Sequence, residues 1–376
     1  MTREAGAERR VSGSGASRPY RLLLTTWQSK AAGSIQSVEY LARGLAELGH
    51  DVRVACPPDG VLGRRLAAGP VPVVPLSFER GWSLAAARAL ARVIREQRVE
   101  LVDAQESRDR KAAILARWVH RTPNRLVITR RQMSATLPLL NALYARAADR
   151  IIAISEGVAR DLASRGTPRR AISVVHTGLD PARIPPSVPT AAVDALREEH
   201  GLDPSLPTVG VVARRKDQET LLRAAARLPP LNVLFVGIER DGELAALEPA
   251  LPEGSRVVYA GFRGDVAAHY ALLDAMVLAT RREGLSQAIL EAMAAGVPVV
   301  SAAVGGTPEV VRHEANGLLF PPGDDGALAA ALRRILEDDE LRARCVAEGR
   351  AAVAGPFHMD AFVRGTERVY RELLEG

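Results

Sequence analysis

One stretch of the chain constrains its fold more than any other: residues 281–311, RREGLSQAILEAMAAGVPVVSAAVGGTPEVV. It places a turn at Glu283 and Gly284, a capping serine at Ser286, a helical segment that Gly296 ends, and an apolar run at 297–301. An apolar run of this length is typical of a parallel strand that is covered on both faces. The helical segment repeats apolar residues at the three-and-four spacing of a buried helix face: Ala288, Ile289, Ala292, Met293 and Ala295. The order predicts a loop, helix, strand and loop of a doubly wound sheet.

Two carboxylates belong to this unit. Glu283 precedes the helix, and Glu291 lies inside it, about 12 Å further along at helical rise. The free amides of the helix N-terminus, from Leu285 to Gln287, point to the carboxyl edge of the sheet, where phosphates bind. Two carboxylates at this separation can accept hydrogen bonds from two sets of hydroxyls. The alternative is a pair of solvated glutamates, but a carboxylate among apolar neighbours, as Glu291 is, costs free energy unless it is paired or used.

The stretch resembles the signature of retaining glycosyltransferase family 4: a glutamate, seven residues, a second glutamate that opens EAMAAGVPVV, and a GGTPEVV loop. The resemblance covers about residues 20–375 and is most specific from 256 to 323. It implies the α/β class and the GT-B fold, in which two Rossmann-like domains, each a doubly wound parallel sheet, face a cleft. The expected parts are a flexible tail at 1–19, an acceptor domain at 20–183, a linker at 184–205, a donor domain at 206–355, and a helix at 356–376 that packs back on the first domain.

Short apolar runs alternate with helical segments in both halves, which predicts parallel sheets. The first half contains seven such runs, at 20–26, 52–55, 71–76, 101–104, 126–129, 151–154 and 172–175. The second half contains five, at 208–213, 232–236, 257–260, 275–279 and 297–301.

Composition indicates an ordinary soluble protein, 47% hydrophobic and 25% charged. The first nineteen residues lack the apolar region of a signal peptide, so we expect a cytoplasmic protein. Cys56 and Cys345 form no CxxC pattern and are expected to be buried thiols. Residues 20–183 carry 26 Lys and Arg against 14 Asp and Glu, whereas residues 184–376 carry 20 against 28. The basic first half is expected to meet an anionic partner, and an anionic inner membrane surface and solvated helix faces both remain open.

Transfer of a sugar from a nucleotide sugar requires stabilisation of negative charge on the departing diphosphate. Arg214, Arg215 and Lys216 follow the strand at 208–213, where cations can reach a pyrophosphate, although a solvated basic cluster remains the alternative. The resemblance implies that Glu283, Lys216 and Arg214 are catalytic and that no metal or other cofactor is needed. It also implies a donor-binding set: Glu291, Gly284, Leu285, Ser286, Gly261, Phe262 and Arg215.

The acceptor side is expected at the ends of strands in the first domain. Family members have two glycines in the first loop, where this chain has Gly33 and Ser34. Many also place a histidine after the fifth strand, and here Arg130 and Arg131 follow Thr129 instead. We expect Arg131 to replace the histidine as an electrostatic partner and Arg130 to face the acceptor; a weakened enzyme is the alternative. Two further acceptor-side candidates end the fourth strand: Gln105 and Glu106.

The sequence thus predicts a retaining hexosyltransferase-type enzyme (EC 2.4) that uses a nucleotide-diphosphate sugar and a glycan or lipid-linked acceptor. Cell-surface polysaccharide or lipopolysaccharide synthesis is the expected context. A non-catalytic GT-B protein that binds a sugar nucleotide or supports a partner is the alternative. A nicotinamide-dependent dehydrogenase is disfavoured, because GxGxxG is absent after the first strand. Nucleic acid is not expected, since no recognised binding motif accompanies the charge.

Overall fold

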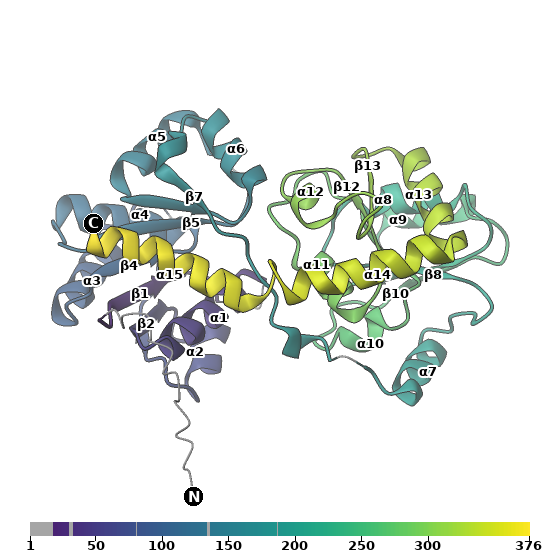
Figure 1. Ribbon diagram of the computed structural model, residues 1–376, viewed down its shortest axis with the longest axis horizontal. Helices are drawn as coiled ribbons and strands as arrows, with labels where there is room; N and C mark the ends of the chain where they lie inside the picture. The colour runs from purple at the N-terminus through teal and green to yellow at the C-terminus, as the bar shows by residue number, and fades with distance from the viewer. Residues whose placement is uncertain (1–17, 30–32, 80, 134–135, 186) are drawn as a thin grey trace, which may run out of the picture.

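The computed structural model describes residues 18–29, 33–79, 81–133, 136–185 and 187–376. Nearly all of the expected tail, residues 1–17, lies outside these ranges. The described chain forms two lobes, each built around its own parallel sheet (Figure 1). Both sheets have the doubly wound order of a Rossmann-like domain.

The first sheet has the order β3-β2-β1-β4-β5-β6-β7, with every pair parallel. Its strands are β1 (Arg21–Thr25), β2 (Asp51–Cys56), β3 (Val73–Pro75), β4 (Leu101–Ala104), β5 (Arg125–Arg130), β6 (Arg150–Ala153) and β7 (Ile172–Val174). Its helices are α1 (Gly33–Glu47), α2 (Val61–Leu66), α3 (Leu84–Glu96), α4 (Ser107–Val119), α5 (Pro138–Ala147) and α6 (Glu156–Ser164). The central strands β1, β4, β5 and β6 are almost wholly buried, as expected of a sheet covered on both faces, whereas the edge strands β3 and β7 are more exposed.

The second sheet has the order β10-β9-β8-β11-β12-β13, again all parallel. Its strands are β8 (Thr208–Val212), β9 (Asn232–Val236), β10 (Arg256–Tyr259), β11 (Ala275–Leu278), β12 (Val299–Ala302) and β13 (Leu318–Phe320). Its helices are α7 (Thr190–Glu199), α8 (Gln218–Ala225), α9 (Gly242–Ala245), α10 (Ala267–Tyr270), α11 (Gln287–Ala295), α12 (Thr307–Val310), α13 (Asp325–Glu337) and α14 (Asp339–Ala354). Short 3-10 turns lie at Arg169–Ala171, Pro181–Arg183 and Glu248–Ala250.

The second sheet has one strand more than the five that the sequence predicts. The additional strand, β13, contains only three residues and adds to the edge of the sheet beside β12. Three apolar residues followed by two prolines give no period that could be recognised in the sequence.

The last helix, α15 (Met359–Glu375), returns to the first domain. Figure 1 shows it continuing from α14 along the first lobe, where it packs against α1. Phe362, Val369 and Tyr370 enter the core around β1 and β2. The Tyr370 hydroxyl donates to Asp103, a fully buried carboxylate that also accepts from Thr129 at 2.8 Å. The C-terminal segment is therefore an integral part of the first domain's core.

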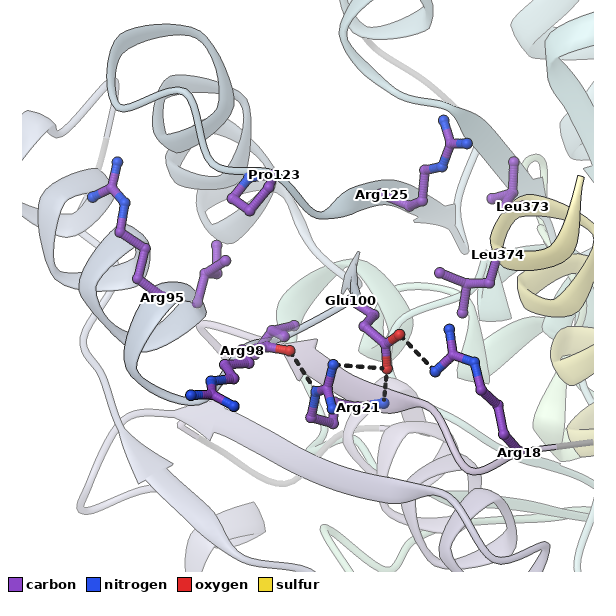
Figure 2. Close-up of a pocket in the computed structure, with 11 residues that line it drawn as sticks. Arg18, Arg21, Arg95, Arg98, Glu100, Pro123, Arg125, Leu373 and Leu374 are labelled. Atoms are coloured by element: carbon purple, nitrogen blue, oxygen red, sulfur yellow. Dashed lines mark hydrogen bonds and ion pairs between the residues drawn. The ribbon is translucent and has the colours of Figure 1, made fainter.

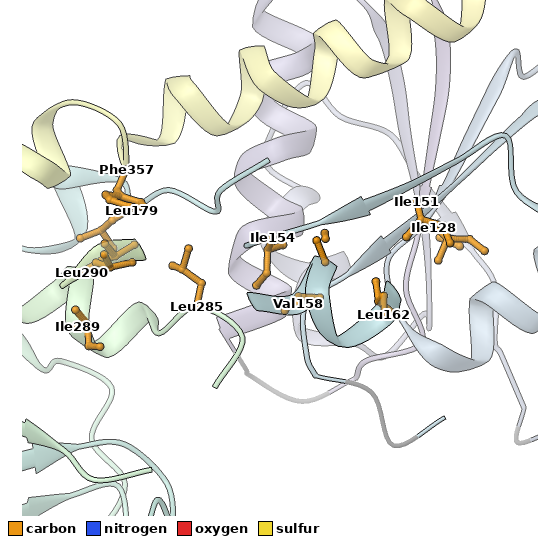
Figure 3. Packing of buried hydrophobic residues seen from close by; sticks show 14 of the residues in the cluster. Ile128, Ile151, Ile154, Val158, Leu162, Leu179, Leu285, Ile289, Leu290 and Phe357 are labelled. Carbon is orange, nitrogen blue, oxygen red and sulfur yellow. The ribbon is translucent and has the colours of Figure 1, made fainter. Parts of the chain in front are cut away.

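A single hydrophobic cluster spans the junction of the domains. Figure 3 shows Leu285 of the second domain between two groups of the cluster: Ile154 and Val158 of the first domain on one side, and Leu290, Leu179 and Phe357 on the other. Leu179 accepts a backbone hydrogen bond from Met359 and donates one to Phe357, at 3.1 and 2.8 Å. The two chain segments that connect the domains thus lie side by side.

Candidate functional site

The helix α11 has the start and the stop that its sequence predicts. Ser286 is the N-cap, and its hydroxyl accepts from the amide of Ile289 at 3.4 Å. Gly296 ends the helix with φ at 78°, a left-handed conformation that a residue without Cβ adopts at little cost. Of the predicted apolar face, Ile289, Ala292 and Met293 are buried, whereas Ala288 and Ala295 are half-buried. The N-terminus of α11 is therefore fixed at the carboxyl edge of the second sheet.

Lys216 and Glu283 meet at this edge. Lys216 follows β8 and Glu283 follows β11, and the Lys216 Nζ lies 2.9 Å from a carboxylate oxygen of Glu283. The lysine side chain keeps 32% of its surface exposed, so the pair is open to a ligand. The structure brings together two residues that the sequence assigns to the same chemistry, although 67 positions separate them.

Glu291 lies deeper, with 6% of its surface exposed. One carboxylate oxygen accepts from Arg183 at 2.5 Å, and the other accepts from the Tyr270 hydroxyl at 3.0 Å. Burial raises the pKa of Glu291, although the charge of Arg183 opposes the shift. The carboxylate is thus paired, as its apolar neighbours require.

The facing edge of the first domain presents Arg131. Its guanidinium donates to Gln105 at 2.7 Å and is near Glu106 and Asp103, while burial lowers its pKa. Burial likewise raises the pKa of Glu106, and the charge of Arg131 and a hydrogen bond with Ser34 oppose this shift. Within the described part of the chain, Gln105 Nε2 and Arg131 Nε are buried without a hydrogen-bond partner. Two donors near the edge of the first sheet are therefore left unsatisfied within the protein.

The two edges touch directly. A Cβ atom added to Gly284 would lie 2.2 Å from the carbonyl oxygen of Arg131, so only glycine allows this approach. The Ser155 hydroxyl, at the start of α6, donates to the Gly284 carbonyl at 2.8 Å. The turn that carries Glu283 therefore packs against the residue that stands in the place of the family's histidine.

Other expected site residues lie apart from this group. Arg215 is bound by three surface carboxylates, Asp241, Glu219 and Glu243, and does not join Lys216. Arg130 is buried near Tyr144 and Arg110, and burial together with the charge of Arg110 lowers its pKa to about 9.

The remaining candidates have less defined surroundings. Arg214 follows β8, and its carbonyl accepts from Gln218 at 3.0 Å. Gly33 begins α1. In the loop after β10, Gly261 has φ at 65° and Phe262 is 75% exposed. Leu285 and Ser286 are buried at the start of α11.

The structure adds residues that sequence reasoning missed. Arg183 and Tyr270 hold Glu291, and Glu309 of the GGTPEVV loop crosses to the first domain. The apolar surroundings of Glu291 indicate that it needs a partner, but no spacing in the sequence identifies Arg183, which lies 108 positions away. Glu309 stands inside the recognised motif and could have been singled out on that ground.

A cavity of about 500 Å³ lies elsewhere, at the amino edge of the first sheet. Figure 2 shows Arg18 and Arg21 converging there on Glu100, with Leu373 and Leu374 of α15 at its rim. Arg95 donates to a backbone carbonyl and Arg125 pairs with Asp149, so most of the arginines already have partners. This cavity lies at the opposite edge of the first sheet from Gln105 and Arg131, which follow the carboxyl ends of β4 and β5.

The described residues include no group of three or more His, Cys, Asp or Glu side chains arranged to hold a metal ion. Both cysteines are buried and free. Among the helices in the described ranges, none is both long enough and apolar enough to cross a membrane.

Solved structures with the same architecture confirm the predicted GT-B fold. A glycosyltransferase from Rickettsia africae aligns with a TM-score of 0.84 at 18% identity over 96% of this chain and 100% of that one. The Anabaena protein HepE, solved in complex with UDP, aligns with a TM-score of 0.80 at 22% identity over 95% and 100%.

Curated relatives are similar over part of their length. A lipopolysaccharide core biosynthesis glycosyltransferase of Rhizobium meliloti is 32% identical over 221 residues, which are 58% of this chain and 63% of the relative. A D-inositol 3-phosphate glycosyltransferase of Mycolicibacterium vanbaalenii is 34% identical over 245 residues, 59% of this chain and 53% of the relative. The matches thus span between about half and two thirds of these relatives.

Two family models match consecutive parts of the chain. The one described as Glycosyltransferase Family 4 matches residues 32–183, and the one described as Glycosyl transferases group 1 matches residues 194–352. The first match covers β2 to β7 of the first sheet, and the second covers every strand of the second sheet. The chain therefore belongs to the group 1, family 4 glycosyltransferases of the GT-B fold.

Proposed function

We propose that the protein transfers a sugar from a nucleotide-diphosphate sugar to a hydroxyl of a glycan or lipid-linked acceptor, with retention of the anomeric configuration. One observation carries this proposal: Lys216 and Glu283 meet beside the N-terminus of α11, against Arg131 of the facing domain. A cation and helix amides at one point suit a diphosphate. A neighbouring carboxylate suits the hydroxyls of the sugar that the diphosphate carries.

The donor is expected to lie along α11. Its diphosphate would face Lys216 and the helix amides, its sugar would bond to Glu283, and its ribose would reach Glu291. The HepE structures contain UDP and UDP-glucose, which makes uridine the first base to test here. Lys216 and the helix N-terminus would stabilise the charge that develops on the departing diphosphate.

Retention follows if the acceptor hydroxyl attacks on the face from which the diphosphate leaves. The new bond joins the acceptor oxygen to the anomeric carbon while the bond from that carbon to the phosphate oxygen breaks. The hydroxyl proton passes to a phosphate oxygen, so no protein nucleophile is required. Arg131, with Gln105 and Glu106, would bind the acceptor or the donor from the first domain, and no metal or other cofactor is invoked.

The decisive experiment is differential scanning fluorimetry of the wild type and Glu291→Ala with UDP, GDP, ADP, TDP and CMP. A ligand that binds the native state raises the melting temperature by mass action. We expect one nucleoside diphosphate to stabilise the wild type but not the variant. The matching sugar nucleotide is then tested for hydrolysis and for transfer to glycan and lipid-linked acceptors.

The alternative, a non-catalytic GT-B protein, predicts nucleotide binding without turnover. Because a cation also helps a protein to bind a diphosphate, the contact between Lys216 and Glu283 fits both interpretations, and turnover is the measurement that separates them. Absence of stabilisation by every nucleotide, in a folded protein, would remove the support for the transferase and favour a non-catalytic protein that supports a partner.

Contact with an anionic membrane surface is a second proposal, and cell-envelope glycan synthesis is the context that it fits. Leu137 and Leu139 at the start of α5 are 67% and 82% exposed, and Trp82 and Leu84 at the start of α3 are also exposed. The ring of Trp82 lies 6.4 Å from that of the buried Tyr144 in α5, so the two segments contact each other. Exposed apolar side chains on a basic domain are suited to an anionic bilayer from the cytoplasmic side.

Co-sedimentation with vesicles tests this surface. Wild type is expected to sediment with vesicles of anionic lipid and less with neutral ones, and Leu139→Glu to lose this binding. Leu48→Glu, which changes an exposed leucine just beyond α1, is the matched control and should sediment like the wild type. Equal sedimentation of the two variants would exclude the α5 surface.

A further inference from the structure

We propose that Glu309 is a positioning residue for the transfer reaction: it binds the N-terminus of α6 in the opposite domain and thereby holds the donor turn in place. This inference rests on the proposed transferase activity. No role is assigned to Glu309 by the donor and acceptor sets described above.

The contacts of Glu309 cross the domain interface. Its two carboxylate oxygens accept from the backbone amides of Glu156 and Gly157, each at 2.7 Å. The same carboxylate lies 2.8 Å from Nε2 of His176. The carboxylate is thus held by three groups, all of which belong to the first domain.

The chemistry of this contact is that of an anion at a helix N-terminus. The first amides of a helix have no partner within it, and the helix dipole favours negative charge there. Ser155 caps the amide of Val158, and Glu309 supplies acceptors for the two amides that precede it. The second domain therefore completes the capping of a helix in the first domain, which it can do only while the two domains are together.

The contact is coupled to the donor turn through two glycines. A Cβ on Gly157 would lie 2.2 Å from the backbone of Gly305, and one on Gly305 would lie 1.8 Å from the carbonyl oxygen of Glu283. The backbone segments at Gly157, Gly305 and Glu283 thus pack directly against one another, from α6 to the turn that carries Glu283. With Ser155 bonded to the Gly284 carbonyl, the position of α6 fixes the position of the turn.

Loss of the Glu309 carboxylate should therefore separate turnover from nucleotide binding. The groups proposed to bind the nucleotide, Lys216, Glu291 and the amides of α11, lie on the second domain, whereas the three partners of Glu309 lie on the first. The turn would lose its support from the first domain, and small displacements of a residue that positions the substrate reduce the rate strongly. We expect Glu309→Ala to lower kcat by about tenfold or more while the Kd for the nucleoside diphosphate changes by less than about twofold.

The test compares Glu309→Ala and Glu309→Gln with Glu348→Ala, which removes an exposed carboxylate paired with Arg312 in the same domain. Glutamine keeps one acceptor oxygen, so its kcat should lie between those of the wild type and the alanine variant. The Glu348 variant should match the wild type. Small-angle X-ray scattering should give a larger radius of gyration for Glu309→Ala, and amide hydrogen exchange should be faster in residues 155–162.

Three results would overturn the proposal: an unchanged kcat, an equal loss of kcat and nucleotide affinity, or an unchanged radius of gyration with slow exchange in α6. If the wild type shows no transfer from any donor, the proposed function fails instead. Scattering and hydrogen exchange then still decide whether Glu309 holds the two domains together.

Discussion

The guanidinium of Arg183, in the segment that leaves the first domain, donates to the buried carboxylate of Glu291 at 2.5 Å. This is the carboxylate to which we assign the donor ribose. Arg183 also lines a small hollow, together with Asp180 and with Tyr40 of α1. A second carboxylate, that of Asp180, is therefore near Arg183 when the ribose binds. Arg183 therefore occupies a position for which the ligand competes.

Replacement of Arg183 by alanine should tighten nucleotide binding. The variant frees a carboxylate oxygen for the ribose and leaves a buried charge that a ligand can satisfy. We expect the Kd for the preferred nucleoside diphosphate to fall by about three- to tenfold in calorimetry, which is about 0.6 to 1.4 kcal/mol. Arg197→Ala, which removes a surface pair with Asp194, is the control. Weaker binding would mean that Arg183 itself holds the ribose.

Lys216→Met should reduce turnover by about a hundredfold or more, the usual cost of removing one group that stabilises transition-state charge. Its partly exposed pair with Glu283 contributes little to folding, so the melting temperature should change by only a few degrees. Arg215→Met is the informative neighbour. Because Arg215 is bound by surface carboxylates, its loss should leave turnover nearly unchanged. A large loss of turnover in Arg215→Met would restore the donor-binding role that the sequence predicts for Arg215.

Asp109 should make stability depend on pH. It is fully buried, and burial, with the nearby charge of Glu106, raises its pKa from 3.8 to about 7. Between pH 3.8 and about pH 7, the carboxyl group of Asp109 keeps its proton in the folded protein but has lost it in the unfolded chain. The contribution of Asp109 is thus fully present below pH 3.8 and is lost as the pH rises to about 7.

Asp109→Asn tests this dependence, because an amide does not titrate. The free energy of unfolding of the wild type minus that of the variant should decrease from pH 4 to pH 7 and then level off, as measured by urea denaturation. A constant difference for Asp109→Asn would mean that this carboxyl group is ionised throughout.

Tyr370→Phe should destabilise the first domain. The hydroxyl is one of the donors to buried Asp103, and an unsatisfied buried carboxylate costs about 1–3 kcal/mol. Tyr20→Phe is a matched control, since its hydroxyl bonds to Glu375 at the exposed end of α15. Thermal unfolding should show a clear decrease in Tm for the first variant and a small one for the second. Equal decreases would contradict the role of Asp103.

Local chemistry made much of this structure predictable. Ser286 and Gly296 fix the ends of α11, and the apolar runs indicate almost every strand, because caps and buried strands are specified by neighbouring residues. The contacts between domains are different. Glu309 reaches amides that lie 152 and 153 positions earlier, and nothing near either residue records that partnership.

Charge pairing explains why three adjacent cations in the sequence have different positions in the structure. Arg214, Arg215 and Lys216 are equivalent in the sequence, but Arg215 meets Asp241 and Glu219, whereas Lys216 meets Glu283. Which cation turns to the site depends on where β9 and β11 place their loops. This information appears only when the second sheet is assembled.

The paired crossing of the chain between domains, with Leu179 hydrogen-bonded to Phe357 and Met359, restricts how the lobes can move. A single connection would allow the two domains to rotate about any axis. Two connections that are hydrogen-bonded to each other at one place act as a hinge, for which only rotation about the axis of the crossing is easy. When the two domains open and close, Glu283 and Arg131 would then return to the same relative position each time, without a lateral shift.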